Sequence, residues 1–260
     1  MRIARIAHGR GMSFGIVEGE GSGATVTEIS GHPFGEISTT DQRWALDDVR
    51  LMSPMLPSKV VCVGRNYVAH AQEHDADVPS EPLLFLKPST SVIGPNDEIR
   101  LPPQSKQVEH EAELAIVIGM PGARRVTDRD EAEAAIFGYT CANDITARDI
   151  QEKDGQWARA KGFDSFCPLG PWIDTDIDPS DVEIRCEVND SVRQLGRTKD
   201  MVFSPAAIVS YVSHVMTLLP GDVVLTGTPE GVEPLNAGDS VSVSIDQIGT
   251  LTNQVVSLES

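Results

Sequence analysis

Apolar and polar positions along the chain form mostly short patterns, and these patterns predict many β-strands and few helices. Runs of alternating or continuous apolar residues recur between Gly, Pro, Asn and Asp, which is typical of strands separated by turns. Helical spacing is rarer, at 66–73, 127–137 and 205–219, with a polar segment at 146–157 that is either helix or loop. The predicted strands are 3–6, 14–17, 25–29, 59–63, 83–87, 108–118, 138–145, 182–188, 223–225 and 241–245, and a tight turn at 189–190 is expected to make a hairpin.

Two of the predicted helices have recognisable ends. Thr127 is expected to be an N-cap, because acidic residues follow it in the first turn and Gly138 comes after the apolar pattern. Ser204 and Pro205 suit the N-cap and first positions of the other helix, which the Pro-Gly pair at 220–221 closes. Both helices are expected to be structural.

A change in composition at residues 51–59 predicts a domain boundary. This stretch, L-M-S-P-M-L-P-S-K, contains two prolines that rule out regular structure. The prediction is a small N-terminal β domain at 1–54 and a larger domain at 55–260, which a length of 260 residues accommodates.

Three glutamates lie on one face of the predicted strand 108–118. Because strand side chains alternate, Glu109, Glu111 and Glu113 point to the same side, and no Lys or Arg lies among them. Both faces become apolar further along the strand, so the carboxylates stand at the entrance to a core and need a compensating cation. Asp144, near the end of strand 138–145, offers a third carboxylate for a hard cation such as Mg²⁺ or Mn²⁺. On spacing alone, a polar strand end in water explains the pattern equally well.

Other residues with acid/base or charged side chains occur at helical spacing. His70 and Glu73 are three positions apart, so the carboxylate can orient the imidazole, although a surface histidine beside an acid gives the same pattern. Arg148 and Gln151 share a face if their segment is helical. An isolated lysine such as Lys161 is normally solvated, and only nearness to the carboxylates gives it a role.

Composition and charge exclude several classes of function. With 39 acidic against 21 basic residues, the formal net charge is -18, which repels nucleic acid and anionic lipid surfaces. No apolar segment has the length of a membrane span or the form of a leader, so a cytoplasmic protein is expected. The loop 226–231 lacks the lysine and spacing of a phosphate-binding loop, which excludes a nucleotide, but its amides and hydroxyls can hold a carboxylate. Four cysteines without a C-x-x-C pair are expected to be buried free thiols: Cys62, Cys141, Cys167 and Cys186.

Six motifs occur in an order that is specific to one family. They are G-R-N-Y-x-x-H at 64–70, F-L-K-P-S at 85–89, H-E-A-E-L at 110–114, N-D-I-T-A-R-D at 143–149, K-G-F-D at 161–164 and T-G-T-P-E-G-V at 226–232. Together they resemble the fumarylacetoacetate hydrolase family, and the N-terminal segment resembles the small extra domain of bacterial members. The resemblance implies a mixed, β-rich α+β fold with rolled sheets that enclose the site, and assembly as a homodimer.

The resemblance also implies a metal site and the residues around it. Mg²⁺ or Mn²⁺ would be bound by Glu111, Glu113 and Asp144, with Glu109 outside the ligand set. Ca²⁺ is less suitable, because it takes about 6–8 oxygen ligands, often from an acidic loop. The remaining implied residues are catalytic His70 and Glu73 on a lid segment, catalytic Lys161 near the metal, and substrate-binding Arg65, Ser89, Arg148, Gln151 and Thr228.

The implied substrate is a 2-oxo acid, whose carboxylate and keto oxygen chelate the cation so that an enolate is stabilised. The main expectation is hydrolysis of a C–C bond in an acylpyruvate-type compound such as fumarylpyruvate, with His70 and Glu73 activating water and Lys161 stabilising the oxyanion. The alternatives use the same enolate: decarboxylation or tautomerisation of oxaloacetate, or isomerisation of 2-hydroxyhepta-2,4-diene-1,7-dioate. A protein that binds metal and 2-oxo acid without turnover is a further alternative, and the acid/base pair argues against it.

Overall fold

Strands dominate the computed structural model, which describes residues 1–73 and 75–258 of the chain. The strands of the largest sheet are β1 (Arg2–His8), β2 (Gly11–Glu18), β3 (Thr25–Ile29), β4 (Thr39–Ala45), β5 (Arg50–Met52), β6 (Val60–Gly64), β7 (Leu83–Lys87), β8 (Val92–Ile93), β11 (Ala112–Ile118), β12 (Ile136–Asn143), β14 (Cys167–Asp174) and β17 (Val223–Leu225). Across the described residues this sheet has 12 strands in the order β4-β3-β2-β1-β14-β12-β11-β17-β6-β7, with β5 beside β1 and β8 beside β14.

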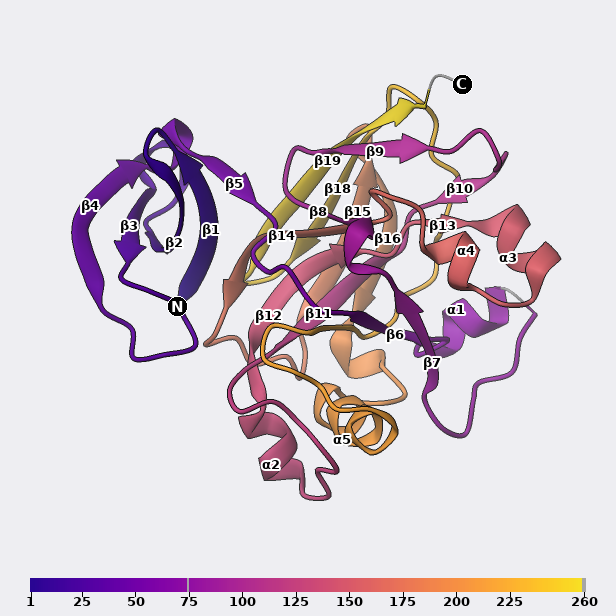
Figure 1. Ribbon diagram of the computed structural model, residues 1–260. Coiled ribbons are helices and arrows are strands. Elements are labelled where there is room, and N and C mark those ends of the chain that lie inside the picture. Colours follow the sequence, from indigo (N-terminus) through magenta and orange to yellow (C-terminus); the bar gives the residue numbers. More distant parts are fainter. Residues whose placement is uncertain (74, 259–260) are drawn as a thin grey trace.

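A second sheet lies against the middle of the first. Its order is β16 (Ser191–Arg197), β15 (Glu183–Val188), β18 (Ser240–Ile245), β19 (Gly249–Ser257) and β9 (Glu98–Leu101), while β10 (Val108–Glu109) pairs separately with β13 (Thr146–Ala147). The helices are α1 (Val68–Glu73), α2 (Arg129–Ala134), α3 (Arg148–Asp154), α4 (Ala158–Lys161) and α5 (Pro205–Val215). In Figure 1, α2 and α5 lie together at one end of the body, whereas α1, α3 and α4 gather on its side. None of these described helices is both long and apolar enough to cross a membrane.

The N-terminal strands form a unit of their own that remains joined to the large sheet. Figure 1 shows β1 to β4 as a curved sheet beside the main body. Its small core contains Ala4, Ile6, Val17 and Val26. Pairing of β1 with β14 places Arg2 opposite Asp174, so the small β domain continues the sheet of the catalytic part.

Strand β11 runs through the centre of the molecule and is covered on both faces. All seven of its residues are buried, and it pairs antiparallel with β12 on one side and β17 on the other. Leu114 and Ile116 belong to one apolar cluster, and Ala115 and Val117 belong to another on the opposite face. The expectation that the acidic strand runs into a core is therefore confirmed, and all four cysteines are buried and free as predicted.

The continuous strand predicted for 108–118 is wrong, because the chain breaks at His110 and Glu111. The amide of Glu111 donates to the side chain of Asn143 at 2.9 Å, and its carbonyl accepts from the amide of Asp144 at 2.8 Å. These bonds replace regular ladder pairing and fold β10 away from β11. The break brings Glu111 to the end of β12, next to Asp144, the residue that follows this strand.

The predicted helices are shorter in the structure. Asp128, not Thr127, caps α2, because its carboxylate accepts from the amides of Asp130 and Glu131. The residues predicted to finish this helix join β12 instead. Ser204 caps α5 as predicted. That helix ends at residue 215, because the backbone of Leu218 pairs with Ala123 in a β-bridge. The hairpin at 189–190 is confirmed, whereas the pattern missed β4 and β5.

Candidate metal-dependent active site

A cavity of about 240 Å³ opens beside the start of β11. Its walls come from the end of β6, from α1, α3 and α4, and from the loop that follows β17. These segments are far apart in the sequence, and the two sheets and their connections bring them together. The six family motifs meet around this one cavity.

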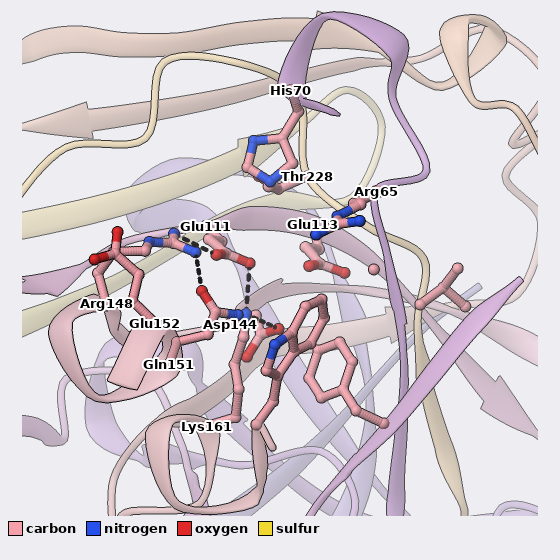
Figure 2. A pocket seen from close by; sticks show the side chains of 14 residues that line it. Arg65, His70, Glu111, Glu113, Asp144, Arg148, Gln151, Glu152, Lys161 and Thr228 are labelled. Carbon is pink, nitrogen blue, oxygen red and sulfur yellow. Dashed lines mark hydrogen bonds and ion pairs between the residues drawn. The ribbon is translucent and has the colours of Figure 1, made fainter. Parts of the chain in front are cut away.

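Three carboxylates lie together at the bottom of the cavity. Glu111, Glu113 and Asp144 are all buried, and each offers an oxygen that lies within 4.8 Å of an oxygen of the others. Figure 2 shows the three carboxylates converging between His70 and Lys161. The polar strand end in water is therefore excluded, and the structure has the three carboxylates together as the cation hypothesis requires.

Two buried lysines hold two of these carboxylates, those of Glu111 and Asp144. The Nζ of Lys161 lies 2.8 Å from Glu111 Oε2 and 2.8 Å from Asp144 Oδ2. The Nζ of Lys87 contacts Asp144 Oδ1 at 2.5 Å and the carbonyl of Ile145 at 3.1 Å. Lys161 is therefore near the carboxylates, which was the condition for its role. Lys87 was not predicted as a site residue. The sequence feature that could have indicated it is a lysine at the end of an apolar strand, within the family motif at 85–89.

Arg148 is bound to the carboxylates rather than exposed to the cavity as a free cation. Its Nε donates to Glu109 at 2.7 Å, its Nη2 to Glu111 at 2.7 Å and its Nη1 to Gln151 at 2.6 Å. The predicted contact between Arg148 and Gln151 is therefore present. Glu109 stands behind Arg148, outside the carboxylate triad, and the substrate-binding role of Arg148 stays a prediction.

The electrostatic balance leaves one carboxylate without a cation of its own. Burial raises the pKa of Glu111, but Lys161 and Arg148 outweigh burial and hold that pKa below its usual value. Burial, followed by repulsion from Asp144 and Glu111, raises the pKa of Glu113 well above its usual value. Glu113 accepts a hydrogen bond from the amide of Gly227 at 2.6 Å. The raised pKa shows that the ionised form of Glu113 lacks a compensating cation, which a hard divalent cation bound to these oxygen donors would supply.

His70 and Glu73 lie together on α1, above the carboxylates. The distance from His70 Nδ1 to Glu73 Oε2 is 3.4 Å, and the amide of Gly231 donates to Glu73 Oε1 at 3.1 Å. Figure 2 shows the imidazole pointing into the cavity from the side opposite Lys161. The contact predicted from the helical spacing is therefore present, and Glu73 supports His70 from behind.

Of the predicted substrate-binding residues, Arg65, Arg148, Gln151 and Thr228 line the cavity and Ser89 does not. Ser89 is exposed, and its hydroxyl donates to the carbonyl of Ser58 at 3.2 Å. The reason is that Lys87 turns inward at the end of β7, after which the chain leaves the site in the short 3₁₀ turn at 89–91. Ser89 therefore lies outside this cavity, and its substrate-binding role stays a prediction.

Two aromatic side chains and Arg65 also line the cavity. Phe85 and Trp157 meet edge to face there, with ring centroids 5.1 Å apart. Arg65 has a left-handed backbone conformation, with φ of 57°, and within residues 1–73 and 75–258 its side chain forms no hydrogen bond or ion pair. Its positive charge is therefore available to a ligand.

The chain matches two known protein families, one for each of its two parts. The family described as fumarylacetoacetate (FAA) hydrolase C-terminal matches residues 59–256, and the family described as Rv2993c-like, N-terminal, matches residues 1–54. The chain belongs to the fumarylacetoacetate hydrolase family. It is a β-rich enzyme of that family with an Rv2993c-like N-terminal β domain.

Two relatives illustrate the range of similarity within this family. Protein Rv2993c of Mycobacterium tuberculosis is 52% identical over 264 residues, which cover 98% of both chains. The human mitochondrial oxaloacetate tautomerase FAHD2A is 45% identical over 80% of this chain and 70% of its own. Four fifths of this chain is therefore similar to a protein named as a tautomerase.

Three solved structures extend the comparison. The 5-carboxymethyl-2-hydroxymuconate delta-isomerase from Mycobacterium smegmatis has a TM-score of 0.93 at 53% identity, over 99% of this chain and 100% of its own. The 2-hydroxyhepta-2,4-diene-1,7-dioate isomerase from Mycobacterium marinum has a TM-score of 0.93 at 51% identity, over the whole of both chains. The maleylpyruvate hydrolase from Sphingobium sp. SYK-6, in complex with manganese(II) and pyruvate, has a TM-score of 0.80 at 32% identity, also over the whole of both chains.

Proposed function

We propose that this enzyme is a divalent-metal-dependent isomerase or tautomerase of a 2-oxo dicarboxylic acid. The observation that carries the proposal is the position of His70 and Lys161 on opposite sides of the carboxylate triad, where two proton-carrying groups can serve one bound substrate. Three relatives at 45–53% identity have isomerase or tautomerase names, whereas two structures with hydrolase names are 36% and 32% identical. Isomerisation or tautomerisation is therefore favoured over the hydrolysis expected from the sequence.

The triad provides the ligands for the cation. Glu111, Glu113 and Asp144 would hold Mg²⁺ or Mn²⁺, since both prefer oxygen donors and leave positions open for a substrate. When bound, such a cation supplies Lewis-acid polarisation of the 2-oxo group, which makes the neighbouring C–H more acidic.

His70 is assigned the transfer of the proton at carbon. With Nδ1–H donated to Glu73, the basic nitrogen of the neutral imidazole is Nε2, on the side of the ring away from Glu73. Glu73 keeps the ring in this tautomer and is itself held by Gly231. Tautomerisation and isomerisation of a 2-oxo acid both need proton transfer at the carbon beside the 2-oxo group. His70 is placed to carry out this step.

Lys161 is assigned the oxygen side of the substrate. Two of the three N–H groups of its ammonium are used by Glu111 and Asp144, which leaves one donor for a substrate oxygen. Although burial lowers the pKa of Lys161, Asp144 and Glu111 outweigh burial and raise it, so the side chain stays charged. It therefore stabilises negative charge that develops on the oxygen.

Arg65 is assigned the second carboxylate of the substrate. Among the described residues no carboxylate pairs with this cation of the cavity lining, and Phe85 and Trp157 provide apolar surface for the carbon chain. Arg148 and Gln151 are assigned the 2-oxo acid end, and Thr228, whose hydroxyl donates to the carbonyl of Ala112, is assigned a place in the wall beside it. The homodimer and the cytoplasmic location stay predictions.

The test is a substrate panel with Mg²⁺ or Mn²⁺. The purified protein is mixed with enol oxaloacetate, 2-hydroxyhepta-2,4-diene-1,7-dioate and an acylpyruvate, and the ultraviolet band of each enol or diene is followed. We expect rapid ketonisation or isomerisation of a dicarboxylate with carbon skeleton intact, as measured by mass spectrometry. Release of pyruvate from the acylpyruvate as the fastest reaction would make the enzyme a hydrolase and refute the proposal.

A further inference from the structure

Gln194 is the one buried residue of strand β16 among seven, and it is polar. The strand lies at the edge of the five-stranded sheet, and its neighbours Val192 and Leu195 are exposed. A carboxamide taken out of water at such a position destabilises the fold unless every donor and acceptor is paired. The partners of Gln194 therefore indicate its role.

Four hydrogen bonds pair the whole carboxamide. Its Oε1 accepts from the amide of Ala112 at 3.0 Å and from Nδ1 of His110 at 2.9 Å. Its Nε2 donates to Thr228 Oγ1 at 2.8 Å and to the carbonyl of Pro229 at 2.7 Å. The orientation is unambiguous, because an amide N–H only donates and a carbonyl only accepts. Gln194 thus joins the start of β11 to the loop after β17.

That loop, residues 226–231, contacts both halves of the active site. Near its start, the amide of Gly227 donates to Glu113 at 2.6 Å, and the hydroxyl of Thr228 donates to the carbonyl of Ala112 at 2.8 Å. At its end, the amide of Gly231 donates to Glu73, which supports His70. The loop therefore runs from the metal-site carboxylates to the acid/base pair without regular secondary structure of its own.

Gln194 holds this loop between its two functional ends. The bonds to Thr228 and Pro229 lie between the contact with Glu113 and the contact with Glu73. The hydroxyl of Thr228 is committed as well, since it accepts from Gln194 and donates to Ala112. The hydroxyl of Thr228 is therefore fixed in one orientation and has no O–H left to donate to a ligand in the cavity.

We propose that Gln194 is a positioning residue that sets the height of His70 above the carboxylate triad. It acts through the loop 226–231 on Glu73, and through Glu73 on the imidazole. The inference rests on the proposed function for the role of His70 in proton transfer. It adds that the position of His70 depends on a residue of the second sheet, Gln194, which lies outside the cavity.

The kinetic test is the variant Gln194→Met, which has a similar volume and no hydrogen-bonding amide. General acid/base assistance is worth about 10²–10⁴-fold, so partial misplacement of His70 is expected to lower kcat roughly tenfold or more, with KM and Mg²⁺ affinity within about twofold of wild type. In a His70→Ala background, Gln194→Met should change kcat by less than about twofold. Equal loss in both backgrounds would make Gln194 a merely structural residue. Leu195→Met, on the same strand, is the control.

A second measurement does not depend on turnover. Hydrogen exchange at residues 68–73 and 230–231 should become about tenfold faster in Gln194→Met, with β18 and β19 unchanged. Faster exchange without turnover of any 2-oxo acid would uphold the positioning role and reject the proposed function. Unchanged exchange would overturn the positioning role. If Gln194→Met does not fold, Gln194→Glu, which keeps the acceptor for Ala112 and loses both donors, undergoes the same measurements.

Discussion

Replacement of Lys87 by methionine removes one of the two ammonium groups that hold Asp144. Both side chains are fully buried, so water cannot take the place of the lost charge. Loss of one partner of a buried ion pair typically costs about 3–5 kcal/mol. Since about 1 kcal/mol shifts the melting temperature of a domain of roughly this size by about 2–4 °C, the metal-free Lys87→Met variant should melt roughly 6–20 °C below wild type.

The cation should reverse much of this loss. A divalent ion in the triad supplies positive charge beside Asp144, and a ligand at 100 times its Kd stabilises the folded state by about 2.7 kcal/mol. The assay is a thermal melt with chelator and with a Mg²⁺ series. The expected result is a larger Mg²⁺-dependent rise in melting temperature for Lys87→Met than for wild type.

Lys59 provides a matched control away from the cavity. It forms an ion pair with the fully buried Asp222, so Lys59→Met should also lower the melting temperature. The Mg²⁺-dependent rise in melting temperature of Lys59→Met should be no larger than that of wild type. An equal Mg²⁺ response of both variants, or a Lys87→Met melting temperature within about 2 °C of wild type in chelator, would show that the charge balance described for the triad is incorrect.

Three further substitutions separate the roles at the site. Glu113→Gln should weaken Mg²⁺ binding at least about tenfold by calorimetry, because an amide lacks the charge that the cation compensates; unchanged affinity would remove Glu113 from the ligand set. His70→Ala should lower turnover by about 10²-fold or more while metal content, measured by mass spectrometry of the native protein, stays at the wild-type level. Arg65→Gln should raise KM for a dicarboxylate about 10-fold or more, since a charge-assisted hydrogen bond is worth about 1.5–3 kcal/mol, and should leave KM for a monocarboxylate 2-oxo acid unchanged.

Much of the strand framework was predictable from local pattern. Strands such as β7 and β17 occur at the predicted residues, because alternation and flanking Gly and Pro depend only on near neighbours. The patterns failed where a side chain accepts a hydrogen bond from a backbone amide and so changes the course of the chain. Asn143 breaks the acidic strand at Glu111, and Asp128 begins α2 one residue later than expected.

The candidate site divides in the same way. The sequence by itself determined the fold and the carboxylate triad through the family resemblance of the ordered motifs, and the His70–Glu73 contact through helix spacing. Strand spacing alone left a polar strand end in water as an equal explanation of the glutamates. Only the tertiary structure decided that Lys87 pairs with Asp144 across 57 positions, that Gln194 reaches Ala112 across 82, and that Ser89 lies outside the cavity. Such contacts depend on the order of strands in the sheets and on which faces meet, and no local pattern of apolar and polar residues encodes either.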